Sequence, residues 1–304
     1  MDPFSQVFSL LNVRSSRCTR FEASGRWAFR FPAKPALKFG AVLRGACWID
    51  FGGEERHHLV AGHSFLIADG PGYILANDEA VVPLDGIAMF DWEHSDVARH
   101  EGSDTILVAG SFTFDISDAD LLLEALPRFL SIPAQHPSAD IIRATLHIIG
   151  QELGSTRIGA AMLAERLVDV LLVQVLRAAL DQDGNREFGW IGALTDPRIG
   201  KTLRLMHGDV AHPWSIDELC GQVAMSRSAF SKRFKALVGT APLDYLLRWR
   251  MRVARNMLRQ EKSVALVASD VGYASESAFR HAFKRVYGHA PKRDWRLPAA
   301  AEGL

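Results

Sequence analysis

Residues 226–242 read SRSAFSKRFKALVGTAP, and residues 275–291 read SESAFRHAFKRVYGHAP. The first Ser, both Phe, the Lys after the second Phe, the Gly and the final Pro recur in both stretches, each displaced by 49 positions. A repeat of this length that carries helical signals indicates a duplicated supersecondary unit. The search for function therefore starts with this repeat.

Each copy is expected to fold as two helices joined by a tight turn. The apolar residues recur at helical spacing, and the expected N-caps are Ser215, Ser226 and Ser275. Gly239 and Gly288, each followed by a proline, fit helix C-termini, and Gly272 fits the turn of the second copy. The two predicted helix-turn-helix units span about 214–236 and 263–285.

In a helix-turn-helix unit, the second helix enters the major groove of DNA. Arg, Lys, Ser, Glu and His on its outer face can contact base edges or phosphates. The expected DNA contacts are Arg227, Ser228, Ser231, Lys232 and Lys235 in the first copy, and Glu276, Ser277, Arg280, His281 and Lys284 in the second. For one copy alone, a helical bundle with a solvated basic face is the better interpretation, but two copies in register favour DNA binding.

The charges are distributed unevenly along a chain that is neutral as a whole, with 35 basic and 35 acidic residues. Residues 195–298 hold 19 basic and 9 acidic residues, whereas the remainder holds 16 basic and 26 acidic ones. A basic C-terminal module beside an acidic partner is the distribution expected of a nucleic-acid-binding protein. We do not expect the acidic half to touch DNA.

Residues 242–259, between the two copies, are rich in helix formers, and their one proline stands at the first turn. A helix of this length measures about 27 Å, close to the roughly 34 Å between successive major-groove faces on one side of B-DNA. It would hold the two reading helices about one turn apart. Its expected buried residues are Tyr245, Leu246, Trp249, Val253 and Met257, and its arginines at positions 248, 250, 252 and 255 are expected around its surface.

The C-terminal half resembles the DNA-binding domain of the AraC/XylS family of bacterial transcription regulators. The resemblance covers residues 195–298 and is most specific in the second copy. Its matching residues are Leu219, Ala224, Ser226, Phe230, Phe234, Lys235, Gly239 and Pro242, with Val271, Gly272, Tyr273, Ser275, Phe279, Phe283, Lys284, Arg285, Gly288 and Pro291. Cys220 stands where the family most often has Ala, and Trp295 stands where Tyr is usual.

From about residue 27 to residue 114 the chain changes to short apolar runs separated by Gly, Pro, Asn and Asp. The expected strands begin at Phe39, Cys47, His58, Ser64, Tyr73 and Thr105. Many short strands at close spacing favour an antiparallel barrel or sandwich.

This N-terminal half resembles the cupin-type sensor found on one branch of AraC-family regulators, as far as about residue 185. The matching features include Asp2-Pro3, Gly45-x-Cys47-Trp48, the Gly62 turn with Leu66, and Gly110-x-Phe112-x-Phe114. A barrel interior can hold a small ligand, so we expect an effector there, although the sequence identifies neither the effector nor its contact residues.

No metal, cofactor or catalytic residue is expected in this half. Metal-binding cupins use a His-x-His pair, which does not occur in the chain, and the nearest histidines are His57, His58 and His63. Because neighbours on a strand face opposite sides, His57 and His58 cannot share one metal ion. We interpret all three as surface or core histidines.

A cysteine relay is the sharper alternative for sensing. It would need two thiols that can approach each other, and Cys18 and Cys47 are the candidates in this half. Some AraC-family relatives carry Cys before the glycine equivalent to Gly110, where this chain has Ala109, which weakens the redox hypothesis. Cys47 beside Trp48 is most simply a small buried hydrophobic residue.

Residues 118–182 change to helical periodicity. Apolar stripes run through residues 121–129, 141–153 and 161–176, and the third has more apolar surface than one packing face uses. The excess favours self-association into a homodimer, and packing against the barrel alone is the alternative. Residues 183–194 are expected to form a linker.

The fold class expected is therefore two-domain α+β. An antiparallel, cupin-like β-barrel should occupy residues 1–117, followed by the helical dimerisation segment at 118–182 and the linker. An all-α double helix-turn-helix domain should occupy residues 195–298.

The expected function is that of a sequence-specific transcription regulator, not an enzyme, controlled by a small effector. Its expected partners are double-stranded DNA, RNA polymerase and a second copy of the chain. The chain has no secretory signal, no membrane span and no paired cysteine spacing, so we place it in the bacterial cytoplasm, at the nucleoid. The alternatives are a cupin-like enzyme tethered to DNA and an architectural DNA-binding protein without an effector.

Overall fold

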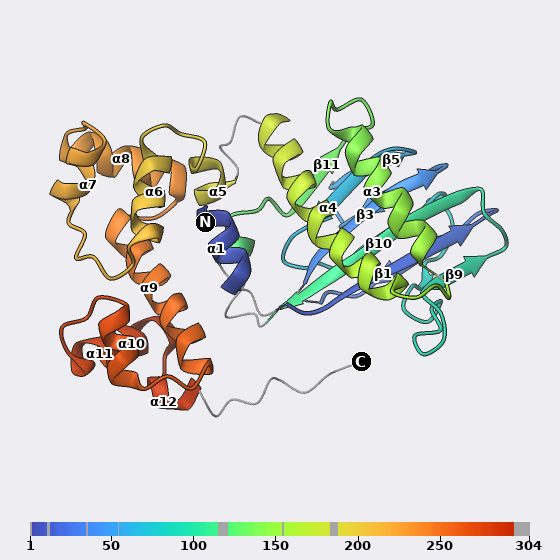
Figure 1. Ribbon diagram of the computed structural model, residues 1–304. Helices are drawn as coiled ribbons and strands as arrows, with labels where there is room; N and C mark the ends of the chain where they lie inside the picture. The colour runs from blue at the N-terminus through green and yellow to red at the C-terminus, as the bar shows by residue number, and fades with distance from the viewer. Residues whose placement is uncertain are drawn as a thin grey trace. The chain divides into compact units, whose positions relative to one another are not determined.

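The computed structural model describes residues 2–10, 13–34, 36–53, 55–114, 121–153, 155–182 and 188–294. The chain divides into two compact units (Figure 1). The sheet unit comprises Val13–Ile116 and Leu126–Gly184, and the helical unit comprises Met1–Asn12, Ser117–Ala125 and Asn185–Leu304. The two-domain α+β class predicted from the sequence is confirmed.

The helical unit contains short helices arranged along one longer helix. They are α1 (Pro3–Leu10), α5 (Gly189–Ala193), α6 (Ile199–Gly208), α7 (Ile216–Gln222), α8 (Arg227–Val238), α9 (Pro242–Arg259), α10 (Val264–Asp270), α11 (Glu276–Tyr287) and α12 (Pro291–Asp294). Helix α9 begins and ends at the residues predicted for the connecting helix. Both pairs of short helices predicted around it are present.

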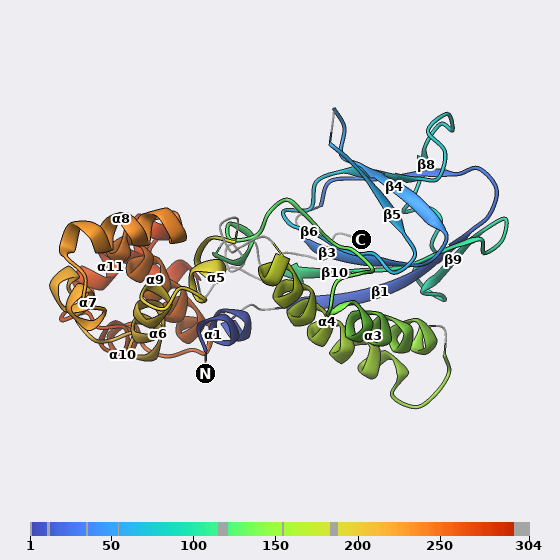
Figure 2. The ribbon, with the colours of Figure 1, turned by 90° about the horizontal axis from the view of Figure 1, so that it is seen from above.

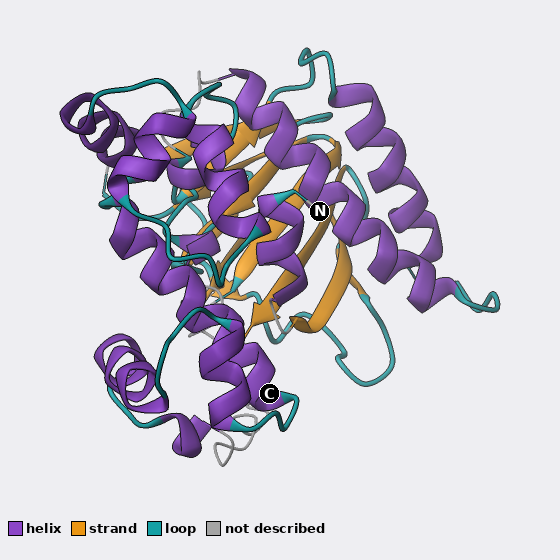
Figure 3. Cartoon of the chain, turned by 60° about the vertical axis from the view of Figure 1, so that its left-hand side comes forward, coloured by secondary structure: helices purple, strands orange, loops and turns teal. Residues whose placement is uncertain are grey.

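The sheet unit holds every strand in the described part of the chain (Figure 3). They are β1 (Val13–Ala23), β2 (Ala28–Phe31), β3 (Leu37–Arg44), β4 (Ala46–Asp50), β5 (Arg56–Val60), β6 (Ser64–Ile67), β7 (Tyr73–Ala76), β8 (Leu84–Asp85), β9 (Val97–His100), β10 (Thr105–Phe114) and β11 (Phe129–Ile132). One sheet has the order β11-β6-β3-β10-β1-β9 and the other β5-β4-β7-β2-β8.

The closed antiparallel barrel predicted from the sequence is wrong. No hydrogen-bonded ladder joins the two sheets within the described ranges, so they are not closed into a barrel. The pairs β1–β9 and β2–β8 are parallel. The spacing of apolar runs predicts strands but not which edges meet, because edge pairing depends on residues far apart in the chain. The arrangement is the two-sheet sandwich that the same spacing allowed.

The space between the two sheets is filled by side chains. Phe21, Trp27 and Phe29 pack in one cluster with Ile49 and Phe65, all of them buried. Phe21 lies edge-on to both Trp27 and Phe29, with ring centroids 5.2 Å apart in each pair. A buried aromatic cluster of this kind gives the sheet unit a solid hydrophobic core.

Five strands, β1, β2, β8, β9 and β11, were not among the six predicted, and two of them are instructive. β1 is rich in Arg, Ser and Thr and lacks the apolar alternation by which strands are recognised in a sequence. β11 falls inside the segment predicted to be helical, and that prediction is wrong for residues 124–132, which form a turn and then β11. Pro127 and Pro133 bracket the strand, and its alternate residues Leu130 and Ile132 are buried where β11 pairs with β6.

Helices α3 (Ala139–Glu152) and α4 (Ala160–Gln182) agree with the predicted second and third apolar stripes. They lie side by side on the face of the six-stranded sheet that points away from the other sheet (Figure 2). The sheet unit therefore has three layers, a helical layer and two sheets. None of the described helices is both long enough and apolar enough to cross a membrane.

The division into compact units differs from the predicted boundary at residue 117. Helix α1 packs against α6 and α9, and residues 121–125 also belong to the helical unit. These segments lie before β1 and after β10 in the chain. Because Val13 at the start of β1 pairs with Phe114 at the end of β10, both segments connect to the same end of one strand pair.

Candidate nucleic-acid interface

Four serines begin the four helices of the repeat. Each hydroxyl accepts a hydrogen bond from the backbone N–H three residues later, as N-cap serines do. The pairs are Ser215 with Glu218 (3.2 Å), Ser226 with Ala229 (3.4 Å), Ser263 with Leu266 (3.3 Å) and Ser275 with Ala278 (3.2 Å). Three of these caps were predicted, and the cap at Ser263 was missed.

The reason for the missed cap is a difference of one residue between the two turns. Helices α7 and α10 are displaced by 48 positions, whereas α8 and α11 are displaced by 49. The turn between α10 and α11 therefore holds one residue more than the turn between α7 and α8. When the first helices of the two copies are aligned with a displacement of 48 residues, Ser215 pairs with Ser263. A displacement of 49 residues does not pair them.

The turns place a residue in the left-handed region of backbone space. Ala224 has φ +51° and Gly272 has φ +81°. At Gly272 a side chain is excluded by contact as well, since a Cβ there would lie 2.2 Å from the carbonyl oxygen of Ala211. The backbone N–H groups of Ala224 and Gly272 donate to Gly221 and Ser269, so both turns use the same hydrogen bond.

The second helices are anchored by equivalent phenylalanines. Phe230 and Phe234 of α8 are fully buried with ring centroids 5.8 Å apart, and Phe279 and Phe283 of α11 are fully buried at 5.7 Å. The equal geometry shows that both copies use the same internal packing. With one face of each helix fixed inward, the opposite face is left for solvent or a ligand.

All ten predicted DNA contacts lie on the outer faces of α8 and α11. Ser231, Glu276 and Arg280 are half-buried, and the others are exposed: Arg227, Ser228, Lys232, Lys235, Ser277, His281 and Lys284. The structure thus brings each set of five onto one helix. Whether these side chains touch DNA stays a prediction.

Two of the arginines are held by carboxylates. Arg280 donates from Nε to Glu276 one turn earlier, at 2.8 Å, and Arg227 of α8 forms an ion pair with Asp217 of α7. The pairing holds the guanidinium groups near their helices, and exchange of a carboxylate for DNA would cost part of the binding energy. Lys232, Lys235 and Lys284 have no ion pair in the described part of the chain, which leaves them available to phosphates.

The arginines of α9 are not distributed over its surface as predicted. Arg252 and Arg255 are buried, and Arg250 donates to the carbonyl oxygens of Val210 (2.9 Å) and His212 (2.6 Å). Their guanidinium groups therefore belong to the interior of the helical unit. Long side chains with apolar stems can be buried in this way, which residue type alone does not indicate.

A buried histidine joins α6 to α9. His207 Nε2 lies 2.7 Å from the hydroxyl oxygen of Tyr245, and its ring stacks on Trp249 with centroids 4.0 Å apart. Burial lowers the pKa of His207 to about 3. The ring of Trp190 lies 6.1 Å from that of His207, and its Nε1 donates to the carbonyl oxygen of Leu121 at 2.7 Å, which ties residues 121–125 to this core.

The histidines of the sheet unit occupy opposite faces of β5, as predicted. His57 stacks on Phe129 with centroids 4.1 Å apart, while His58 lies beside Trp48 at 4.5 Å. Within the described ranges, no group of three or more His, Cys, Asp and Glu side chains is gathered as a metal site would require. His63 is half-buried.

The cysteines of this unit lie in different sheets. Cys18 is on β1 of the six-stranded sheet and Cys47 on β4 of the five-stranded sheet, and both are buried. Burial raises the pKa of each thiol to about 12. Because the thiolate is the reactive form, both are poor candidates for redox chemistry.

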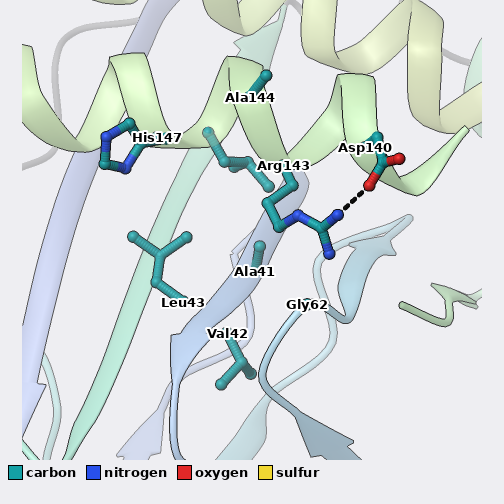
Figure 4. Close-up of a pocket in the computed structure, with 9 residues that line it drawn as sticks. Ala41, Val42, Leu43, Gly62, Asp140, Arg143, Ala144 and His147 are labelled. Carbon is teal, nitrogen blue, oxygen red and sulfur yellow. Dashed lines mark hydrogen bonds and ion pairs between the residues drawn. The ribbon is translucent and has the colours of Figure 1, made fainter. Parts of the chain in front are cut away.

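A cleft of about 370 Å³ lies between α3 and the six-stranded sheet (Figure 4). Val42 and Leu43 line it from β3, and Arg143 and His147 point into it from α3. Arg143 forms an ion pair with Asp140 on the same helix. The cleft has an apolar floor and a polar rim, which is the usual composition of a small-molecule site.

Comparison with known proteins matches both halves. Residues 2–181 match the Cupin family model, and residues 219–296 match the model of a helix-turn-helix domain. A protein described as a putative AraC-like transcription regulator, from Streptomyces antibioticus, is 39% identical over 96% of this chain and 97% of its own length. The HTH-type transcriptional regulator MtrA of Neisseria gonorrhoeae is 32% identical over 96% and 97%, respectively.

Among solved structures, a transcriptional regulator with an AraC-type DNA-binding domain from Chromobacterium violaceum is similar to part of this chain. It is 26% identical and covers 36% of this chain and 99% of its own, with a TM-score of 0.33.

Proposed function

Because the chain belongs to the AraC-like transcription regulators with an N-terminal cupin domain, we propose that α8 and α11 each read one short DNA sequence. The helix-turn-helix domain is a DNA-binding domain, and the similarity to a transcription regulator extends over 96% of the chain. The relatives are named as regulators, which points to a role without catalysis. We place this activity in the bacterial cytoplasm.

The observation that carries the assignment of contacts is the matched inner packing of the two second helices. Both second helices bury the same two phenylalanines and begin at the same serine cap, so equivalent outward positions can enter a groove in the same way. Arg227 and Arg280 contact base edges, and Lys232, Lys235 and Lys284 contact phosphates. Glu276 acts as a discriminator that accepts from cytosine N4 and disfavours other bases.

The effector binds in the cleft between α3 and β3 rather than between the sheets. Two observations support this placement: the intersheet space is filled by the aromatic cluster, and the cleft has the volume of a small-ligand site. Substitution of Ala144, an exposed residue in the cleft wall, by Trp should block the response to an effector and leave DNA binding in its absence unchanged.

The effector signal reaches the helical unit through α1 and residues 121–125. Both segments pack in the helical unit and connect to the same end of the strand pair β1–β10. A shift of that strand pair would displace two anchors together, one of which is the hydrogen bond from Trp190 to Leu121. Trp190→Phe keeps the ring and removes the N–H, so it should weaken effector control more than DNA binding.

Helices α3 and α4 form the dimer interface. Ile141 and Ile148 of α3 and Leu163 and Val170 of α4 are exposed, and each pair is seven residues apart, so each pair lies on one face of its helix. Exposed apolar residues on neighbouring helices favour helix pairing between two copies. Replacing Leu163 and Val170 by Glu should convert a dimer to a monomer in sedimentation velocity.

The proposed function is tested by recovering bound fragments from sheared genomic DNA of the host with the purified full-length protein. We expect enriched fragments that share a motif. The double variant Arg227→Ala/Arg280→Ala should lose that enrichment. The double variant Arg26→Ala/Arg157→Ala, which removes two exposed arginines from the sheet unit, is the charge-matched control and should retain it. Equal recovery with all three proteins would contradict the assignment of α8 and α11 as readers.

A further inference from the structure

A second cavity, of about 440 Å³, lies within the helical unit beside the N-terminal half of α9. Three arginines line it: Arg248 and Arg252 from α9, and Arg285 from the last turn of α11. Two carboxylates, Glu124 and Asp244, are also in its wall. The lining therefore carries one positive charge more than it carries negative charges.

Arg252 is the unusual member of this set. The residue is only 7% exposed, and its Nε and Nη1 have no hydrogen-bond partner in the described part of the chain. An arginine remains protonated in proteins, so it cannot avoid the cost of burial by losing its charge. A buried charge without a partner is unfavourable, and an anion bound beside this guanidinium group would offset that cost.

The carboxylates in the wall do not satisfy this group. Glu124 is bound to Arg248 at 3.1 Å, and Asp244 is exposed in the first turn of α9. Arg285 is exposed and forms no ion pair within the described ranges. Two of the three arginines are thus available to a ligand, one buried at the wall and one at the surface.

The backbone at the same place also favours an anion. Thr240 lines the cavity directly before the N-terminus of α9, an eighteen-residue helix whose N-cap, Ala241, makes no side-chain capping bond. The first N–H groups of a helix carry partial positive charge. This contribution adds to that of the arginines.

We propose that this cavity binds a small anion through a carboxylate or phosphate group that Arg252 and Arg285 hold together. Arg248 is the third cation of the site, and Glu124 competes with the ligand for it. Because Glu124 belongs to residues 121–125, binding would release one of the contacts that hold this segment in the helical unit. The anion site itself does not depend on the proposed DNA contacts.

The site lies at one edge of the predicted reading face of α11. Successive residues are about 100° apart around a helix, so Arg285 lies about 140° from Arg280 but only about 40° from His281. A phosphate at the site could therefore come from a free anion or from the DNA backbone, and the experiment distinguishes these sources.

The test is thermal unfolding of the full-length protein with inorganic phosphate titrated against chloride at constant ionic strength. We expect a saturable rise in Tm for the wild type. In Arg252→Met and Arg285→Gln the half-saturating concentration should rise about tenfold or more, as expected for loss of a charged hydrogen bond. Lys262→Gln, which removes a charge outside the cavity, is the control and should match the wild type.

Glu124→Gln should shift phosphate binding in the opposite direction to the arginine variants. Removal of the competing carboxylate should lower the half-saturating phosphate concentration, which a merely structural role of the cavity would not produce. Arg252→Met should also raise Tm without phosphate, because it replaces a buried unpaired charge by an apolar group. If Arg252→Met fails to fold, phosphate binding by the surface variant Arg285→Gln still tests the proposal.

Two results would overturn the proposal. One is the absence of saturable stabilisation by phosphate, or equal stabilisation of the wild type and all variants. The other is a loss of affinity for duplex DNA in Arg285→Gln as large as its loss for phosphate, which would make the cavity a contact for the DNA backbone. Unchanged duplex binding together with weakened phosphate binding is the result we expect.

Discussion

The first and second helix-turn-helix units share one scaffold but differ on the outside. Serine caps, buried phenylalanine pairs and left-handed glycine stops recur in both, with Gly239 at φ +86° and Gly288 at φ +76°. The outer faces carry different residues, and their arginines are held differently. Arg227 binds a carboxylate of the preceding helix, whereas Arg280 binds Glu276 within its own helix.

This difference shows which parts of the repeat are constrained by folding and which are available for recognition. Positions that point inward must keep their size and apolar character in both copies, because they fill equivalent cores. Positions that point outward have diverged in charge. Two copies of one scaffold can therefore read two different DNA sequences.

The largest expected effect on the free energy of unfolding comes from the turns within the two helix-turn-helix units. The turn of the second copy excludes a side chain at Gly272, whereas the turn of the first copy carries Ala224. Gly272→Ala should lower the free energy of unfolding by about 3 kcal/mol, because its Cβ would meet the Ala211 carbonyl oxygen and φ is positive. Ala224→Gly in the first turn should change it by less than about 1 kcal/mol, since relief of strain offsets added chain entropy. Urea unfolding of both variants measures this contrast, and equal effects would contradict the account of the turns.

The arginines should differ in sequence selectivity. Arg280→Ala should weaken binding to a selected operator by about 2 kcal/mol and relax selectivity in one of its two blocks only. Arg227→Ala should do the same in the other block. Fluorescence anisotropy with operators altered in one block at a time makes the comparison. A loss of similar size on random DNA would mean that the arginines contact phosphates.

The first helix-turn-helix unit packs on α9 near the buried imidazole of His207. This imidazole should make the stability of the helical unit sensitive to acid. The pKa of His207 is lowered by burial from about 6.5 in the unfolded chain to about 3 in the folded one, so the unfolded state binds more protons between these values. Stability should therefore fall as pH drops below about 6.5, by roughly 1.4 kcal/mol per pH unit.

Urea unfolding from pH 7 to pH 4.5 measures this slope. His207→Gln keeps a polar side chain and should remove this contribution to the slope, and His281→Gln, at an exposed position on α11, is the control. An unchanged slope in His207→Gln would show that His207 does not titrate as proposed.

The smallest expected effects come from the caps, where the two copies should be equal. Ser226→Ala and Ser275→Ala should each lower the free energy of unfolding by about 1 kcal/mol, because each leaves an N–H of the first helical turn without its acceptor. Thermal unfolding of the two variants compares them directly. A difference greater than about 1 kcal/mol between them would mean that the scaffolds are less alike than their geometry indicates.

The helical unit could be predicted closely because its signals are local. Caps, turn glycines and apolar stripes lie within a few residues of the elements they specify, and α9 follows its predicted bounds. The missed cap at Ser263 results from a one-residue difference in the turns, not from a weak signal. The interior positions of Arg250, Arg252 and Arg255 could not be predicted, because burial of these side chains depends on the elements packed against α9.

The sheet unit was predicted less completely for the same physical reason. Six apolar runs gave β3, β4, β5, β6, β7 and β10, but polar β1 is defined by its partners β9 and β10. The helical period predicted for residues 121–129 is wrong at Phe129, where pairing with β6 determines the conformation. Edge pairing, sheet closure and the cleft beneath α3 all depend on contacts between distant segments.

The most direct test of the central claim is selection of bound sequences from a random duplex pool with the full-length protein at physiological salt. We predict a motif of two dissimilar blocks whose centres lie about one helical turn apart, because one scaffold presents two different outer faces on the ends of α9. A single block, or two identical blocks within one binding site of one protein chain, would contradict two distinct readers. Recovery of no motif, with binding that collapses as salt rises, would leave only phosphate contacts and would contradict sequence reading altogether.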